Sequence, residues 1–429
     1  MYRELLSVDL PTVIKVAAAQ NLDIQQARYN VDAQRGRYET SVGALFPVIA
    51  PALTFNAVDG VNQNANGTLT AANFNTIIPA VSLQWILNPG RVAYDIVASK
   101  KRLQASSELE EAAQLDGLRT AAVQYYDLIL AQAKIAVARQ AVQEAEENLR
   151  LTSLRIRAGT GLAADEMRSR AFLAGRQQDL ILALNTFYEA SVALTVTLHL
   201  DSTVTLVPGP REIDQLTLVT PDLGIDELMA MAVTHRPDLK AARTLLAAAK
   251  SDKSAAVWGA LGPQLQAAYS YGGIEARVGG DSSGLQEQQR ASAGAGFAFG
   301  VSSFGQMKIA RANLGLAATD AERQLDQVRA QVVSAQQASL TASQLVPIAR
   351  EQIESAEEAL RLAQANLKSG TMILLDVLQA QNEVDAGRLR YADAVVRYNQ
   401  AQLNLLGALG LLDASRLTPA TTQTAGRRR

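Results

Sequence analysis

The sequence predicts a mainly α-helical fold in which long antiparallel helical hairpins are combined with four β-strands per chain. Three observations predict it. Apolar residues recur in heptads through two long segments, these segments and their flanks occur twice along the 429 residues, and a pattern with a period of two precedes each hairpin. Heptads indicate helices that pack along a seam, and period-two alternation indicates strands with one apolar face. We therefore expect an internal tandem duplication.

A short helix and a longer one are expected at the beginning of each repeat. Asp9 and Pro11 suit a helix start, because Asp accepts a hydrogen bond from the first turn and proline has its φ already fixed. The helical pattern continues past a break near Asn21. The segment AAAQNLDIQQAR, beginning at Ala17, recurs as AVTHRPDLKAAR, beginning at Ala232, so the same two helices are expected in the second repeat.

Four strands are predicted at about residues 45–57, 77–87, 263–273 and 290–302, where apolar side chains alternate with polar or small ones. A stretch rich in Asn and Gly, Asp59 to Asn75, is expected to be a loop between the first two strands. Strands of this kind fit either a soluble antiparallel sheet with one face exposed to solvent or the strands of a membrane β-barrel.

The membrane interpretation of the strands is favoured because the helices use their apolar residues in their own seams, which leaves nothing to cover the sheet. Four strands cannot close a barrel, and an open sheet in lipid would leave backbone groups unsatisfied. Spanning strands therefore require two, three or four subunits that pool eight, twelve or sixteen strands.

Each pair of strands is followed by a helical hairpin, at about 91–201 and 306–412. In the second hairpin, large apolar residues recur every seven positions on both arms, with Ser339 as the one polar gap, and a small residue follows three positions after almost every one. A 3,4 spacing held over several heptads is typical of a coiled-coil seam, and Ala or Gly in the seam lets two helices approach closely. The first hairpin repeats this scheme from Leu128 to Leu194.

The two hairpins turn at similar sequences, RAGT (Arg157 to Thr160) and KSGT (Lys368 to Thr371). In the second turn, Gly370 is expected to follow the helix end and Thr371 to be the N-cap of the next helix.

The duplication also predicts the organisation of the chain. Residues 1–201 form the first repeat, 202–224 an inter-repeat linker that contains three prolines, and 225–412 the second repeat. The remaining residues, 413–429, are expected to be a disordered tail because they are rich in Thr, Pro and Arg.

Composition excludes several classes of function. The formal charge is −2, which argues against a nucleic-acid partner, and the absence of cysteine excludes disulfides and thiolate chemistry. The two histidines, His199 and His235, lie far apart in the sequence, so no metal site is expected. No catalytic triad and no phosphate loop is visible, so the chain is expected to be neither an enzyme nor a cofactor carrier.

Targeting signals are equally sparse. No run of about 18 apolar residues predicts a transmembrane helix. No signal peptide is visible, which fits a cytoplasmic protein or a mature sequence from which a signal peptide has been removed.

Over nearly its whole length the chain resembles the TolC-like outer-membrane efflux proteins. The resemblance depends on the two repeats, the RPDL helix entry at Arg236, the turns NPGR and SFGQ before the long helices, and the tips RAGTGLAAD and KSGTMILLD. It implies a homotrimer in the outer membrane of a Gram-negative bacterium, with a twelve-stranded barrel, a helical periplasmic tunnel, and an equatorial belt made of the linker and the chain ends. It further implies a passive exit duct for small molecules or proteins, with a periplasmic adaptor and an inner-membrane pump of the RND or ABC type as partners.

The same resemblance implies site residues at the hairpin tips. Asp376 and Asp165 correspond to gate aspartates whose carboxylates face the lumen, although each could instead only favour the positive N-terminus of its helix, a benefit expected to be fading at that position. Gln379 and Met372 replace a second aspartate and an arginine of some members, so we expect a weaker ionic latch and a closed state packed by Met372, Leu374 and Leu375. The candidates for adaptor docking, some of which could simply make the turns, are Gly159, Thr160, Gly161, Leu162, Gly370 and Thr371.

One alternative of another class stays open at this stage. The chain could be a soluble coiled-coil scaffold whose strands form a capping sheet, and such a protein would stay soluble without detergent.

Overall fold

The computed structural model describes residues 5–159, 161–209, 215–220, 223–278, 281–282, 284–297, 300–369 and 371–413. Its helices form matched pairs. The helices α3 (Pro89–Arg157) and α7 (Val301–Ser369) each contain 69 residues, and each precedes a 35-residue helix, α4 (Ala163–Thr197) or α8 (Leu374–Ala408). The 11-residue α1 (Leu10–Gln20) and α5 (Ile225–His235) precede α2 (Leu22–Gly43) and α6 (Pro237–Leu261). These pairs confirm the internal duplication.

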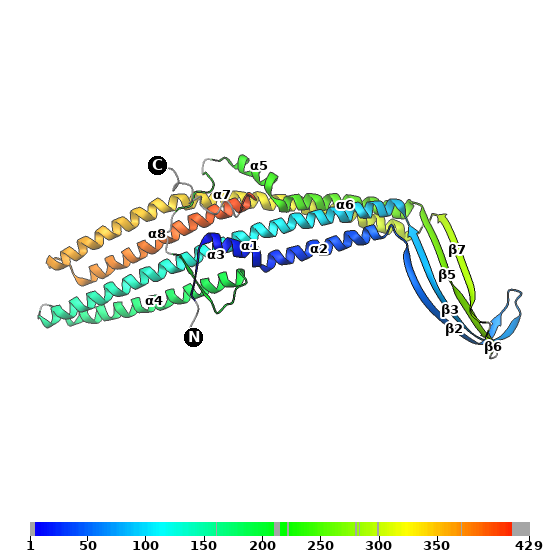
Figure 1. Ribbon diagram of the computed structural model, residues 1–429. Helices are drawn as coiled ribbons and strands as arrows, with labels where there is room; N and C mark the ends of the chain where they lie inside the picture. The colour runs from blue at the N-terminus through cyan, green and yellow to red at the C-terminus, as the bar shows by residue number, and fades with distance from the viewer. Residues whose placement is uncertain are drawn as a thin grey trace, which may run out of the picture. The chain divides into compact units, whose positions relative to one another are not determined.

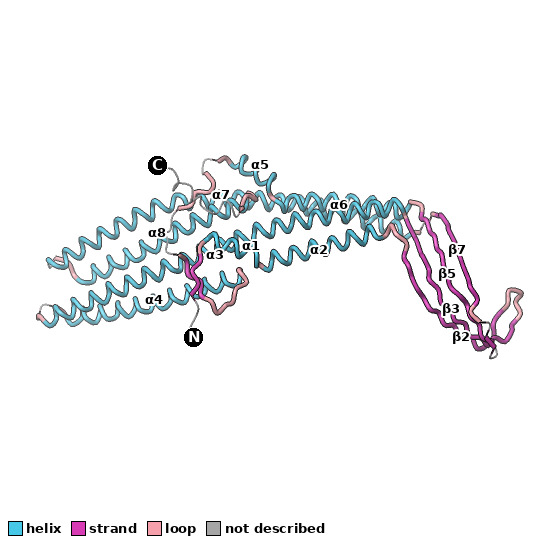
Figure 2. The backbone as a smooth tube through the Cα atoms, viewed as in Figure 1, coloured by secondary structure: helices cyan, strands magenta, loops and turns pink. Residues whose placement is uncertain are grey.

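The chain forms two compact units. Unit 1 contains the residues up to Tyr29, Glu108–Leu239 and the residues from Arg323 onward, and unit 2 contains Asn30–Ser107 and Lys240–Glu322. Both long helices, α3 and α7, therefore contribute to both units. Unit 1 contains both hairpin tips, and unit 2 contains all the long strands (Figure 1 and Figure 2).

In unit 1 the predicted seams form the core of the hairpins. Figure 1 shows α7, α8, α3 and α4 side by side in that order. Of the predicted seam residues, Leu128 and Val332 are fully buried, and so are Val384 and Leu194. Many of the small seam residues are buried as well, which confirms the close approach of the helices at these positions: Ala131, Ala145, Ala335, Ala342, Ala349, Ala394 and Ala401.

The polar gap at Ser339 has a structural partner. Gln402 of α8 is buried, and its side-chain amide donates to the Ser339 hydroxyl at 2.9 Å. Its carbonyl oxygen accepts the backbone N–H groups of Leu218 (3.1 Å) and Val219 (2.8 Å). The linker is therefore held on α8 by a polar residue inside the seam.

A second contact holds the linker to the beginning of the chain. The strand β1 (Leu5–Val8) pairs in parallel with β4 (Thr205–Pro208), with Leu5 opposite Thr205. Leu206 of β4 is fully buried, and its N–H donates to the Ser191 hydroxyl of α4 at 2.8 Å. This small sheet was not predicted from the sequence.

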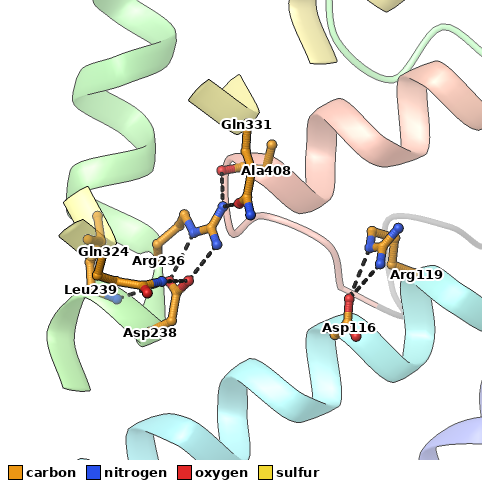
Figure 3. A network of polar contacts seen from close by, with 8 residues as sticks. All are labelled: Asp116, Arg119, Arg236, Asp238, Leu239, Gln324, Gln331 and Ala408. Atoms are coloured by element: carbon orange, nitrogen blue, oxygen red, sulfur yellow. Dashed lines mark hydrogen bonds and ion pairs between the residues drawn. The ribbon is translucent and has the colours of Figure 1, made fainter. Parts of the chain in front are cut away.

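The RPDL motif forms a clamp at the junction of α5 and α6 (Figure 3). Arg236 donates from Nε to Asp238 Oδ1 at 2.9 Å and from Nη1 to Gln331 Oε1 at 2.6 Å, and Asp238 Oδ2 accepts from Gln324 at 2.8 Å. Burial alone would raise the pKa of Asp238, but its hydrogen bonds and the Arg236 charge outweigh burial and hold that pKa below the usual value. Gly410, with φ of 70°, lets the chain pass this arginine, because a Cβ there would lie 3.0 Å from the Arg236 backbone.

Unit 2 contains an antiparallel sheet in the order β2–β3–β5–β7 (Figure 1). Its strands are β2 (Val48–Gln63), β3 (Leu69–Leu87), β5 (Gln264–Val278) and β7 (Gln286–Gly296), and the short β6 (Asp281–Ser282) pairs with β5. The four predicted strands are present, and β2 and β7 lie at the two edges of the order.

All four strands have boundaries that differ from the sequence prediction, and β5 continues to Val278 instead of ending near residue 273. The expected loop from Asp59 to Asn75 is mostly strand, because β2 and β3 continue as a polar hairpin that turns at Gly67, with φ of 82°. The strand expected at 290–302 is β7, which begins at Gln286 and ends at Gly296, and Val301 is the first residue of α7. Alternation in the sequence continued past the true end of β7, because it cannot distinguish the last strand residues from a connecting segment.

The two faces of the sheet differ as predicted. Residues with odd numbers share one face, on which Leu83 lies between Ile49 and Tyr269. Near the helices this face is apolar, and its members include Ile49, Leu53, Phe55, Ile77, Val81, Leu83, Leu265, Tyr269, Tyr271, Ala291, Ala293 and Ala295. Residues with even numbers share the other face, which is mostly polar or small.

In unit 2 the NPGR motif joins the sheet to α3. Asn88 Oδ1 accepts the Arg91 N–H at 3.0 Å, and its Nδ2 donates to the carbonyl of Trp258 in α6 at 3.0 Å. A Cβ on Gly90 would lie 2.2 Å from the Trp258 ring, so only glycine fits beneath it. The motif therefore caps α3 and binds it to α6.

One of the described helices, α4, is long and apolar enough to cross a membrane by length and composition. The expectation that no such segment exists is corrected to this extent. Ala183, Phe187 and Leu194 of α4 are buried in the hairpin core of unit 1, so we assign α4 to the hairpin.

Candidate functional site

The candidate site comprises two turns and the first residues after them, tip 1 between α3 and α4 and tip 2 between α7 and α8. In tip 1, Gly159 has φ of 76°, and a Cβ on Gly161 would lie 2.9 Å from the Ile156 backbone nitrogen. Both glycines are therefore required by the turn itself. Thr160 lies outside the described residues. Leu162, the N-cap residue of α4, is 69% exposed.

Tip 2 closes differently from the prediction. Thr371 is not the N-cap of α8, because that position belongs to Ile373, which provides no side-chain hydrogen bond. Thr371 instead closes the end of α7: its N–H and its hydroxyl donate to the Asn366 carbonyl at 3.0 and 3.1 Å. Gly370 lies outside the described residues. Ile373 is 62% exposed.

The two aspartates lie in the first turns of their helices. Asp165 and Asp376 are the third residues of α4 and α8, and their N–H groups donate to the carbonyls of Leu162 (3.0 Å) and Ile373 (3.3 Å). The expectation that the helix-dipole benefit had faded here is wrong, because both helices begin later than expected. A carboxylate in the first turn contributes about 0.3–1 kcal/mol to helix stability.

The surroundings of the aspartates distinguish them. Asp165 forms an ion pair with Arg168 at 3.4 Å, which neutralises part of its charge. Asp376 has no ion pair among the described residues and is half-buried, so no neighbouring cation there neutralises its charge. Gln379, three residues further along α8, is exposed, and Met372 is half-buried in the turn. Of the residues expected to pack the tip, Leu374 is buried but Leu375 is 49% exposed.

A polar network joins the two hairpins further from the tips. Arg388 of α8 lies 3.6 Å from Glu144 of α3 and 3.2 Å from Glu357 of α7. Arg176 of α4 lies 3.4 Å from Asp385 of α8, and its guanidinium stacks on the Phe172 ring. All four hairpin helices are therefore connected by two arginines.

Uncharged and charged groups in this network are both buried. Gln381 is buried and accepts from Asn148 of α3 at 2.7 Å. Burial raises the pKa of Asp385 despite the opposing charge of Arg176, and within the described part of the chain the Asp385 Oδ1 atom has no hydrogen-bond partner. A carboxylate in this state is costly to keep ionised, so the network is sensitive to the loss of either arginine.

Sequence reasoning placed the tips correctly but missed this network. It also missed Ile373, which occupies the position of tip 2 that Leu162 occupies in tip 1. The signal for Ile373 was the duplication itself, because an apolar residue stands at the same place in both turns. No local signal marked Arg176 or Asp385, since their partners lie far away in the sequence.

Comparison with known proteins gives consistent results. A family model described as outer membrane efflux protein matches residues 13–198 and 228–411. The chain is 23% identical over 419 residues to the outer membrane protein OprJ of Pseudomonas aeruginosa. The aligned residues cover 95% of this chain and 85% of OprJ. Nodulation protein T of Rhizobium leguminosarum bv. trifolii is 22% identical over 415 residues, covering 94% and 85%.

Solved structures show the same fold. The CmeC outer membrane channel of Campylobacter jejuni superposes with a TM-score of 0.80 at 17% identity, covering 95% of this chain and 87% of that one. The outer-membrane channel OprN superposes with a TM-score of 0.81 at 20% identity, covering 94% and 89%.

Proposed function

The chain belongs to the outer membrane efflux protein family and is an outer-membrane protein with a helical periplasmic part, and on this premise we propose that three copies form one continuous duct. The duct is the passive exit of a tripartite efflux or type I secretion system. Its partners are a periplasmic adaptor and an inner-membrane pump of the RND or ABC type, and it exports small toxic compounds or proteins. Family membership removes the alternative of a soluble scaffold.

The observation that carries this proposal is a sheet with one apolar face and two free edges. On the odd-numbered face of β3, the apolar stretch from Ile77 to Leu87 is about 34 Å long at 3.4 Å per residue and rises about 26 Å at a tilt near 40°. The apolar band of an outer-membrane barrel is about 25 Å tall. Among the described residues, β2 and β7 each have one unpaired edge, and three copies joined at these edges close twelve strands.

The helices support a ring as well. Both outer helices of the four in unit 1 expose apolar side chains: Ile181, Tyr188, Val192 and Val196 on α4, and Val333, Leu345, Ile348 and Leu362 on α7. The helices between them, α3 and α8, contact each other within the protomer. If the exposed face of α4 in one copy packs against the exposed face of α7 in the next, the contact between copies is head-to-tail. Repeated contacts of this kind close into a ring.

The tips are the gate of the proposed duct. The uncompensated Asp376 contributes a ring of three carboxylates that attracts cations, and Asp165 adds a weaker ring because Arg168 shares its charge. Leu162 and Ile373, both exposed at corresponding positions of the two tips, are the apolar part of the adaptor-docking surface. Gly159 and Gly161 make the turn that presents Leu162.

The test is reconstitution. The detergent-purified protein is expected to run as a trimer by light scattering and to form conducting channels in planar bilayers. A cysteine pair on neighbouring edges, one in β2 and one in β7, is expected to cross-link only between copies, because the chain contains no other cysteine. A monomer that remains monodisperse after detergent removal would contradict the proposal.

A further inference from the structure

The even-numbered face of the sheet carries one charge. On the described strands β2, β3, β5 and β7, this face contains small, apolar and uncharged polar residues, among them Asn56, Gln84, Gln266 and Gln288, and a single ionisable residue, Arg290 of β7. The other charged residues of these strands lie on the odd-numbered face: Asp59, Glu275, Arg277 and Glu287.

No neighbour on the sheet neutralises Arg290. Its row across the strands reads Ala50, Ser82, Ser270 and Arg290, so its cross-strand neighbours are small and uncharged. The arginine is exposed, and no ion pair involves it among the described residues. The next strand in the proposed trimer, β2 of a second copy, offers no carboxylate on this face in any register, because Asp59 lies on the other face.

The height of Arg290 is equally informative. Its row lies between the Leu83–Tyr269 and Val81–Tyr271 rows of the opposite face, within the apolar band. The odd-numbered face of these strands also carries charges, but they lie toward the end of the band away from the helices, where Glu287 is opposite Gly273 and Glu275 is opposite Ile77. Arg290 lies on the row of Ser82, at the middle of the band. A charge at the middle of the band cannot face lipid without a large penalty, so the even-numbered side of the sheet must face water. The arginine thus projects into the lumen at the depth where the membrane surrounds the barrel.

We propose that Arg290 forms a ring of three guanidinium groups in the barrel lumen that attracts anionic solutes and disfavours cationic ones. This inference rests on the proposed trimeric duct and deepens it by naming a charge class for the solutes. Rings of arginine or lysine select anions in other pores. The duct therefore presents carboxylates at its tips and guanidinium groups at its exit, so the two ends select in opposite senses.

The expected size of the effect follows from the geometry. Twelve strands about 4.8 Å apart and tilted by about 40° give a backbone radius of about 12 Å, and an arginine reaches about 6 Å inward. Its charge then lies about 6 Å from the axis, within the Debye length of about 8 Å at 0.15 M salt but beyond that of about 3 Å at 1 M. Coulomb attraction from three such charges in water concentrates anions about fivefold at 0.15 M and less than twofold at 1 M.

The experiment uses the absence of cysteine from this chain. Arg290→Cys is reconstituted in planar bilayers, and the chloride-to-potassium permeability ratio is measured from reversal potentials at low and at high salt. Because cations are depleted by the factor by which anions are concentrated, the ratio is expected to fall by about 25-fold at 0.15 M and by less than about fourfold at 1 M. Reaction with a trimethylammonium methanethiosulfonate should restore it, and a sulfonate reagent should lower it further.

The matched control is Arg277→Cys on the opposite face, where Arg277 already forms an ion pair with Glu275 at 3.1 Å. Its permeability ratio is expected to stay at the wild-type value before and after modification. If the Arg290→Cys protein forms conducting channels but its permeability ratio equals that of the wild type, before and after reaction with either reagent, the arginine ring is wrong and the proposed duct is unaffected. An equal response at residue 277 would overturn the face assignment, whereas wild-type protein that forms no channel would overturn the proposed duct together with the ring.

Discussion

The returning helices of the two hairpins, α4 and α8, have the same length but different surroundings. Nineteen residues of α8 are buried, whereas six of α4 are. The reason is position: α8 lies between α7 and α3 and also receives the linker, while α4 lies at the outer side of the four helices (Figure 1). Duplication thus produced two helices of equal length, and the elements packed around each one determine that α8 is buried and α4 is largely exposed.

The largest expected effect comes from corresponding positions that differ in burial. Leu403 of α8 is 2% exposed, and Val192, which occupies the same place in α4, is 39% exposed. Leu403→Ala is expected to lower the free energy of unfolding of the protomer by about 2–5 kcal/mol because it leaves a cavity. Val192→Ala should cost the protomer less than about 0.5 kcal/mol. Urea unfolding followed by circular dichroism at 222 nm measures both.

The same pair also probes the ring. If Val192 is covered by a second copy, Val192→Ala should shift the trimer–monomer equilibrium toward monomer in light scattering while protomer unfolding stays unchanged. Equal losses of protomer stability in the two variants would show that α4 and α8 are packed alike, which would break the comparison.

The next effect concerns the linker. Gln402 of α8 and Ser191 of α4 occupy corresponding positions, and each accepts backbone N–H groups of the linker. Gln402→Ala is expected to cost about 2–4 kcal/mol, because it leaves the Leu218 and Val219 amides and the Ser339 hydroxyl without their partner. Ser191→Ala removes one acceptor and should cost about 1 kcal/mol. Limited proteolysis within residues 202–224, compared between the two variants, checks which contact holds the linker.

Arg176 and Asp385 provide a test of the asymmetry between hairpins. The position corresponding to Arg176 in the second repeat is Gly387, so this ion pair exists once per protomer. Arg176→Ala is expected to cost about 1–3 kcal/mol at neutral pH, because the buried Asp385 loses its ion-pair partner and only the charge of Arg388 still opposes the effect of burial.

The pH dependence follows from the direction of the shift. Burial raises the pKa of Asp385 above that of the unfolded chain, so the folded protein retains the proton to higher pH. The contribution of this group to stability is therefore present below the usual carboxyl pKa and falls as the pH rises through the raised value. Arg176→Ala should steepen that fall and Asp385→Asn should remove it, as measured by urea unfolding between pH 4 and about pH 8. A slope that is unchanged in Asp385→Asn would assign the pH dependence to other groups.

The smallest effect distinguishes the two tips. Asp376→Asn is expected to reduce the cation preference of the reconstituted channel about two- to threefold at low salt, and Asp165→Asn less than that, because Arg168 already shares the charge of Asp165. Bilayer reversal potentials measure both. The critical result is which of the two variants loses more cation preference. A larger loss in Asp165→Asn than in Asp376→Asn would reverse the assignment of the main gate charge.

Much of this protein could be derived from the sequence because its elements are periodic. The heptads identified the buried seam residues from Leu128 to Leu405, and alternation identified the four strands and their apolar face. Resemblance to a family then placed Asp165 and Asp376 at the tips. These features depend on local spacing, and a 3.6-residue or 2-residue period determines which side chains share a face before any packing takes place.

Tertiary structure decided the contacts that no period encodes. The later starts of α4 and α8 placed both aspartates in first turns, and the polar seam residues Ser339 and Gln402 proved to hold the linker. The Arg176–Asp385 pair joins positions separated by more than two hundred residues. Sequence spacing determines the face on which a side chain lies, whereas its partner depends on how far one helix is displaced along another, and only the assembled core determines that displacement.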